Sequence, residues 1–185
     1  MVQQFSWLAK RNWEIRSAAT DIISIMYEPT VLNMSKSIHK NFLVVVTAGN
    51  CIKKMDLDDF LNVPPSGILY TKLNEGDFVK DITIVPNKFD IILYSNKKAL
   101  RFNMDEVPHY KRSSVGVIGM NTKEEIDGLS VAYPNAEYIV VVTKNGKINK
   151  FDISGMKLSN RAKAGSSVIK LGKTDNINNI YAVPK

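Results

Sequence analysis

The chain has 185 residues, a mass of 20.8 kDa and a formal net charge of +7. Hydrophobic residues make up 44% and charged residues 23%, as in a folded globular protein, and no apolar run approaches the roughly 20 residues of a membrane-spanning helix. A single cysteine, Cys51, excludes an internal disulfide, and the first residues lack the pattern of a secretory signal. We therefore expect a cytoplasmic protein with no membrane partner.

Residues 1–40 carry the weakest pattern of the chain. Trp13–Arg16 and Asp21–Tyr27 are compatible with strands, but periodicity alone does not decide between strand and helix. The run Asp21–Met26 fits the second half of a repeat that is clearer further along the chain. We expect residues 1–40 to form a partial first blade or a linker segment.

Three β-hairpins are predicted at regular intervals after this segment. Residues 42–56, 90–102 and 138–152 each contain an apolar, β-branched run, a short polar turn and a second run that mixes basic and apolar residues. Asn145-Gly146 predicts a two-residue type I′ turn, and the turn of the middle copy is one residue shorter. The hydroxyl that ends each first strand (Thr47, Ser95, Thr143) recurs every 48 residues. Such a period indicates propeller blades or another repeat array.

The second half of each repeat also recurs. Residues 67–85 match residues 165–183 at an offset of 98, with Asp77 aligned on Asp175, and residues 113–131 form a shorter middle copy. The pattern predicts a strand, a turn at residues 74–77 and a second strand, so each repeat is expected to hold two hairpins. We predict an all-β, propeller-like array of repeats at about residues 41–89, 90–137 and 138–185, forming a partial arc of three to four blades.

Positive charge is concentrated near the end of the chain. Residues 138–185 contain nine Lys or Arg and two acidic residues, which accounts for the whole net charge of +7. This asymmetry indicates a polyanionic partner, nucleic acid before membrane, since no basic amphipathic helix is evident. A propeller-type interaction module that binds an acidic protein partner is the alternative.

The hairpin Val140–Lys150, the stretch Lys111–Gly119 and the paired strands of residues 72–85 and 170–183 together resemble the C-terminal domain of bacterial type IIA topoisomerase A subunits, those of DNA gyrase and topoisomerase IV. The resemblance implies a β-pinwheel, a propeller variant whose blades exchange strands. It also implies a non-catalytic, nucleoid-associated module that binds and wraps double-stranded DNA on a basic outer rim, with the catalytic core of an ATP-hydrolysing topoisomerase as a possible partner. The DNA-binding residues that it implies are Lys53, Lys54, Lys98, Arg101, Lys111, Arg112, Lys147, Lys150, Arg161 and Lys163.

The chain departs from the gyrase pattern at one motif. The gyrase domain carries a basic, glycine-rich box (Gln-Arg-Arg-Gly-Gly-Lys-Gly), and the nearest stretch here is Arg161–Gly165. A geometry like that of topoisomerase IV is therefore expected before gyrase-like wrapping. No pattern of His, Cys, Asp or Glu indicates catalytic residues, a cofactor or a metal site.

Overall fold

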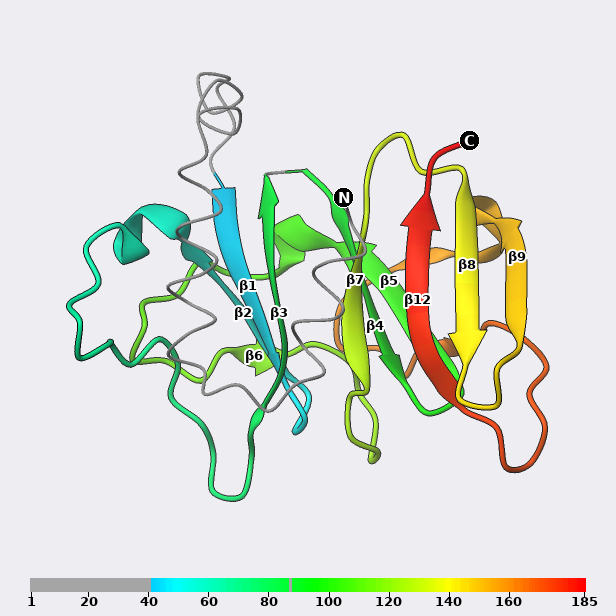
Figure 1. Cartoon of the computed structure of the whole chain (residues 1–185), viewed down its shortest axis with the longest axis horizontal. Coiled ribbons are helices and arrows are strands. Elements are labelled where there is room, and N and C mark those ends of the chain that lie inside the picture. The colour runs from blue at the N-terminus through cyan, green and yellow to red at the C-terminus, as the bar shows by residue number, and fades with distance from the viewer. Residues whose placement is uncertain (1–40, 87) are drawn as a thin grey trace.

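Runs of aliphatic and β-branched residues form the central strand of each of three sheets, which are antiparallel except for the short β10 beside β5 (Figure 1). The computed structural model describes residues 41–86 and 88–185, so the strand or linker predicted within residues 1–40 lies outside the described part. The strands are β1 (Asn41–Thr47), β2 (Cys51–Asp56), β3 (Val79–Pro86), β4 (Asp90–Ser95), β5 (Lys98–Asn103), β6 (Val117–Ile118), β7 (Gly128–Ala132), β8 (Tyr138–Thr143), β9 (Ile148–Asp152), β10 (Leu158–Ser159), β11 (Ser166–Ser167) and β12 (Ile177–Val183). Three short 3-10 helices follow hairpins: η1 (Leu57–Phe60), η2 (Met104–Glu106) and η3 (Ile153–Gly155).

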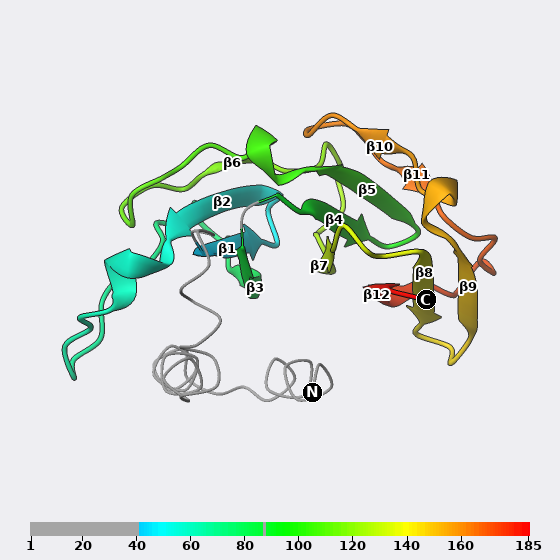
Figure 2. The ribbon, with the colours of Figure 1, turned by 90° about the horizontal axis from the view of Figure 1, so that it is seen from above.

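The three sheets are the blades of a partial propeller. Blade 1 has the strand order β3-β1-β2-β6, blade 2 the order β7-β4-β5 with β10 and β11 both beside β5, and blade 3 the order β12-β8-β9. Figure 2 shows the blades set side by side along an open arc, with β3, β7 and β12 on the concave side and β6, β10, β11 and β9 on the convex side. The all-β, propeller-like prediction is confirmed.

The prediction of two hairpins in every repeat is wrong for the second pair of strands. The first of those strands leaves its own repeat and adds to the outer edge of the preceding blade: β6 pairs with β2 through Ile52↔Val117, and β11 pairs with β5 through Ala99↔Ser166. Residues 67–73, predicted as a strand, form none among the described residues. An alternating pattern of apolar and polar residues indicates a strand. It does not indicate which neighbouring strand will form hydrogen bonds with the backbone of that strand.

Two of the three hairpin turns use the hydroxyl that repeats every 48 residues. The Thr143 carbonyl accepts from the Gly146 amide (3.1 Å) and its Oγ1 accepts from the Lys147 amide (3.1 Å), while Thr47 Oγ1 accepts from the Cys51 amide (3.2 Å). Only Gly146 of the Asn145-Gly146 pair has a positive φ (81°), so the predicted two-residue type I′ turn is wrong. A β-turn followed by one left-handed residue, a common hairpin form, replaces it.

The middle hairpin is shorter, as predicted. Ser95 pairs directly with Lys98, which leaves two residues in the turn. The Ser95 hydroxyl is therefore not needed by the turn and donates instead to the Glu125 carbonyl (2.6 Å).

One aspartate from the second half of each repeat binds the backbone of that repeat's turn. Asp77 accepts from the Gly49 amide (2.8 Å), Asp127 from the Asn96 amide (2.6 Å) and Asp175 from the Asn145 amide (3.1 Å). Burial would raise the pKa of Asp175, but hydrogen bonds from the Thr143 hydroxyl and two backbone amides hold this pKa below its ordinary value. These carboxylates fasten each hairpin to the inner part of its own blade.

Two apolar cores join neighbouring blades. The alternate residues of β1 that face blade 2, such as Val44, pack with Ile91 and Leu93 of β4, while Ile92 on the other face of β4 packs with Ile139 and Val141 of β8. Leu43 and Val45 belong to a third cluster, on the face of blade 1 that points away from blade 2. The blades are therefore held mainly by side chains that alternate along their central strands.

Candidate nucleic-acid interface

The convex side of the arc carries six exposed cations from the predicted set. Their elements lie on the outer edges of the sheets, in the segments between them or, for Lys147, in the turn that leads into β9 (Figure 2). The exposed residues are Lys98 at the start of β5, Lys111 and Arg112 between η2 and β6, Lys147 and Lys150 before and within β9, and Lys163 between β10 and β11. The Lys150 ammonium lies 3.7 Å from the centroid of the Tyr138 ring, a cation–π contact that positions the side chain.

Lys53 and Lys54 are buried, in contrast to these six. Lys53 is 1% exposed, and its Nζ donates to the carbonyl oxygens of Arg112 (3.1 Å) and Ser114 (2.8 Å). Burial lowers the pKa of Lys53 from 10.5 to about 8. Lys54 donates to the Met104 carbonyl (3.2 Å), and burial lowers its pKa although Asp105 partly opposes the shift. Both ammonium groups therefore donate hydrogen bonds to backbone carbonyls in the interior of the protein.

Arg101 and Arg161 are half-buried and connect consecutive blades. Arg101 forms an ion pair with Asp90 (2.7 Å), and its Nη1 approaches the carbonyl oxygens of Ile153 and Met156 at 3.4 Å. The Arg161 guanidinium donates to the backbone carbonyls of Glu106 and Ile118. Four of the ten predicted residues therefore have hydrogen-bonding roles at the joints between blades, and six present free charge on the outer edge.

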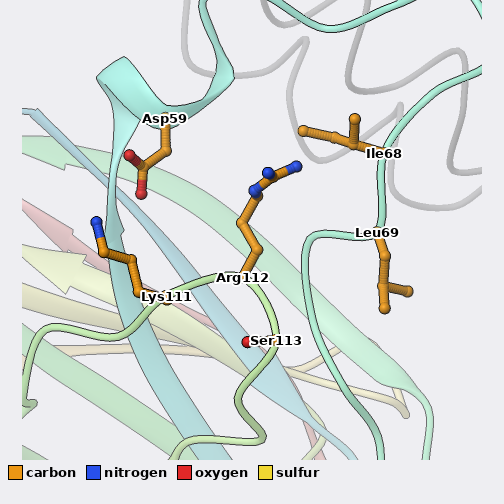
Figure 3. Close-up of a pocket in the computed structure, with 6 residues that line it drawn as sticks. All are labelled: Asp59, Ile68, Leu69, Lys111, Arg112 and Ser113. Atoms are coloured by element: carbon orange, nitrogen blue, oxygen red, sulfur yellow. The ribbon is translucent and has the colours of Figure 1, made fainter.

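Beside Lys111 and Arg112 the surface is hollowed. A cavity of about 530 Å³ is lined by Asp59, Ile68, Leu69, Lys111, Arg112 and Ser113. Figure 3 shows the Arg112 guanidinium projecting into the gap between Asp59 and Ile68, with Leu69 on the far wall. The cavity is open and mixed in polarity, which suits a contact to an extended surface better than enclosure of a small molecule.

Some exposed cations of blade 3 were not predicted individually. Lys157 follows η3 on the way to β10, and Lys170 and Lys173 lie between β11 and β12. The only signal for them in the sequence was the positive charge of residues 138–185.

In the described part of the chain, no three His, Cys, Asp or Glu side chains are grouped as metal ligands, and no helix there has the length and apolar character needed to cross a bilayer.

The chain is similar to known proteins over most of the described region. It matches the family model of the DNA gyrase C-terminal domain, beta-propeller, over residues 41–86, 98–133 and 137–184. It is 30% identical to the DNA gyrase A subunit of Borrelia hermsii over 132 residues, 70% of this chain, and 29% identical to that of Staphylococcus aureus over 129 residues, 68% of this chain. These matches cover 16% and 15% of the relatives, so the chain spans about one sixth of their length.

Solved structures agree with the sequence comparisons. The C-terminal domain of DNA topoisomerase IV superposes with a TM-score of 0.71 at 25% identity, over 78% of this chain and 46% of that chain. The Escherichia coli ParC C-terminal domain, at 11% identity and a TM-score of 0.52, shares the fold over 78% of this chain and 80% of that chain. With three successive segments matched to one family model and the blades arranged as a partial propeller, the chain belongs to the DNA gyrase C-terminal domain family of β-propellers.

Proposed function

We propose that this chain is a non-catalytic module that binds double-stranded DNA along the convex side of its arc and bends it. One observation carries the proposal: five of the six exposed cations of the predicted set belong to outer strands or to the segments that run between them, and the sixth, Lys147, directly precedes the outer strand β9. Lysine and arginine distributed along a curved edge match a curved phosphate backbone, and such contacts position DNA without reading its sequence. The names of the relatives, the DNA gyrase A subunit and DNA topoisomerase IV, support a DNA partner.

The proposal includes a place for the module beside the catalytic core of a type IIA topoisomerase. In that setting it would hold a DNA segment while other domains carry out the change in DNA topology. We propose bending without the gyrase box, because Arg161, the arginine nearest to such a box here, uses its guanidinium on the carbonyls of Glu106 and Ile118. The geometry expected is that of topoisomerase IV.

The salt dependence of binding gives a quantitative test. If each of the six exposed cations neutralises one phosphate, the slope of log K against log salt concentration is about −5, a loss of about 10³-fold between 50 and 200 mM salt. If all ten predicted cations took part, the slope would be near −9. Fluorescence anisotropy with a labelled duplex of a few tens of base pairs measures this slope.

A matched pair of double variants locates the interface. Lys111→Gln with Arg112→Gln removes two charges from the outer edge, and we expect the slope to become shallower by about 2. Lys88→Gln with Lys185→Gln removes two exposed charges next to the inner strands β3 and β12 and should leave the slope unchanged. Equal effects of the two variants, or no duplex binding at low salt, would contradict the proposal; in the second case an acidic protein partner becomes the better hypothesis.

A further inference from the structure

The outer edge of β9 differs from the corresponding edges of the other two blades. In blades 1 and 2 the outer hairpin strand is covered by a strand from the next repeat, and the residues at equivalent positions, Ile52 and Ala99, are 0% and 2% exposed. Among the described residues no strand pairs with the outer edge of β9, and the equivalent Ile148 is 69% exposed. Blade 3 thus presents an unpaired strand edge with a large apolar side chain.

At the opposite end of the arc, blade 1 presents the complementary segment. Gly67, Gly116 and Gly165 recur every 49 residues, all with positive φ, and each directly precedes the position of an exchanged strand. A Cβ on Gly116 would lie 2.5 Å from the Ile52 carbonyl oxygen, and one on Gly165 would lie 2.7 Å from the Ala99 carbonyl oxygen. A Cβ on Gly67 would meet nothing within 4 Å. Gly67 therefore keeps the conformation needed for close approach to a neighbouring strand, while no described strand approaches it.

The segment after Gly67 is already held in the position of an exchanged strand. The Lys72 amide donates to the Ser114 carbonyl (3.2 Å), as the Asn121 amide, 49 residues later, donates to the Lys163 carbonyl (2.9 Å). Leu69, at the position of Ile118 in β6, is 70% exposed. The segment thus has the placement of β6 without a strand to pair with.

The faces of the two terminal blades also correspond to those already joined inside the chain. Val140 and Val142 of β8 lie at the positions of Ile92 and Tyr94, which are 0% and 3% exposed at the joint between blades 2 and 3, but both valines remain partly exposed. The face of blade 1 that points away from blade 2 carries Ile82 and Ile84, which are also partly exposed. At each joint inside the chain, one blade contributes the face that carries Ile92 and Tyr94 in blade 2, and the next blade contributes its opposite face. The free face of blade 3 corresponds to the first of these faces, and the free face of blade 1 corresponds to the second.

From these observations we infer that two copies of this chain associate reciprocally, with Gly67–Leu69 of each copy adding as a strand to the outer edge of β9 in the other. The internal register predicts the pairs Ile148↔Ile68 and Lys147↔Leu69 across the contact. Within one copy these segments lie at opposite ends of the arc, so they cannot meet (Figure 2). Two head-to-tail contacts related by a twofold axis close the assembly, and the resulting six blades fall within the range of known propellers.

Light scattering coupled to size-exclusion chromatography tests the association with the full chain. We expect a mass of twice 20.8 kDa at micromolar concentration. Ile148→Asp places a carboxylate against Ile68 of the other copy, and Leu69→Lys places a second ammonium opposite Lys147; each variant should give a folded monomer. Tyr133→Asp, on the half-exposed connection between β7 and β8, is the control and should remain dimeric. A wild-type mass of 20.8 kDa, or a ladder of larger species, would overturn the inference.

A cysteine pair tests the register. In blade 1 the Gly119 amide donates to the Asn50 carbonyl (2.8 Å), which makes Cys51↔Ile118 a non-hydrogen-bonded pair. The same register would bring the Cα atoms of Lys147 and Leu69 to about 4.5 Å, within disulfide range. The variant Cys51→Ser, Leu69→Cys, Lys147→Cys should become a covalent dimer on oxidation, while Tyr133→Cys in place of Leu69→Cys should not. If both variants cross-link equally, or neither does, the proposed pairing is wrong.

Discussion

The buried ammonium of Lys53 predicts an unusual dependence of stability on pH. Its pKa in the folded protein is about 8, against 10.5 in the unfolded chain. Between these values the unfolded chain binds a proton that the folded protein has released, so the free energy of unfolding rises with pH. The limiting slope for one proton is about 1.4 kcal/mol per pH unit, and two pKa values this far apart give a rise of about 1 kcal/mol between about pH 8.5 and 9.5.

Urea unfolding of the parent chain and of Lys53→Met at both pH values measures this contribution. Both proteins should carry Cys51→Ser, because burial, with Asp77, raises the pKa of the Cys51 thiol and its titration would oppose the effect in the same window. The difference between parent and variant cancels the titration of all other groups. We expect this difference to change by about 1 kcal/mol in favour of the parent at the higher pH. A difference that does not depend on pH would refute a desolvated Lys53.

Two further predictions concern the turn of blade 3. Thr143→Val removes the oxygen that accepts from the Lys147 amide and the hydroxyl that donates to Asp175. The loss should lower the free energy of unfolding, measured by urea titration, by about 1–3 kcal/mol. Thr174→Val changes an exposed threonine and is the control that should leave the free energy of unfolding unchanged. Because the pKa of Asp175 is lowered in the folded protein, its contribution is present above the ordinary value of 3.8 and is lost as pH falls through the folded value. Thermal unfolding should therefore show that the advantage of the parent over Asp175→Asn shrinks in acid; an advantage that persists unchanged there would contradict this role of the carboxylate.

The blade repeat could be predicted because it depends on local chemistry. The hydroxyls of Thr47 and Thr143 satisfy the turn that follows them, and Asp77 and Asp175 reach back to the same turns, so these residue types recur at fixed spacing. The exchange of strands was implied by the family resemblance, but the residue pattern itself carries no comparable signal for it. Residues 113–119 have the same alternation whether they pair within their repeat or with β2, and only the packing of neighbouring blades decides between them.

The charges of the outer edge could be predicted only in part, for a related reason. Lys54 and Arg101 occupy equivalent positions, and both bind backbone carbonyls contributed by the next repeat. The third repeat has Lys150 at this position, and it is exposed. At this position the cation is therefore bound to backbone wherever the following repeat covers the strand. Whether a cation is buried or exposed depends on tertiary contacts, so it cannot be predicted from the number of lysines and arginines along a strand.

The aspartates that bind the turns have a consequence for the history of the molecule. Each hairpin is fastened by a carboxylate of its own repeat, whereas each joint uses backbone from the next. Duplication or deletion of one unit in the gene would leave every turn complete and would change only how many joints follow one another. Duplication or deletion of repeats can therefore produce arrays with different numbers of blades, and hence different lengths of curved edge, without requiring a new kind of contact between blades.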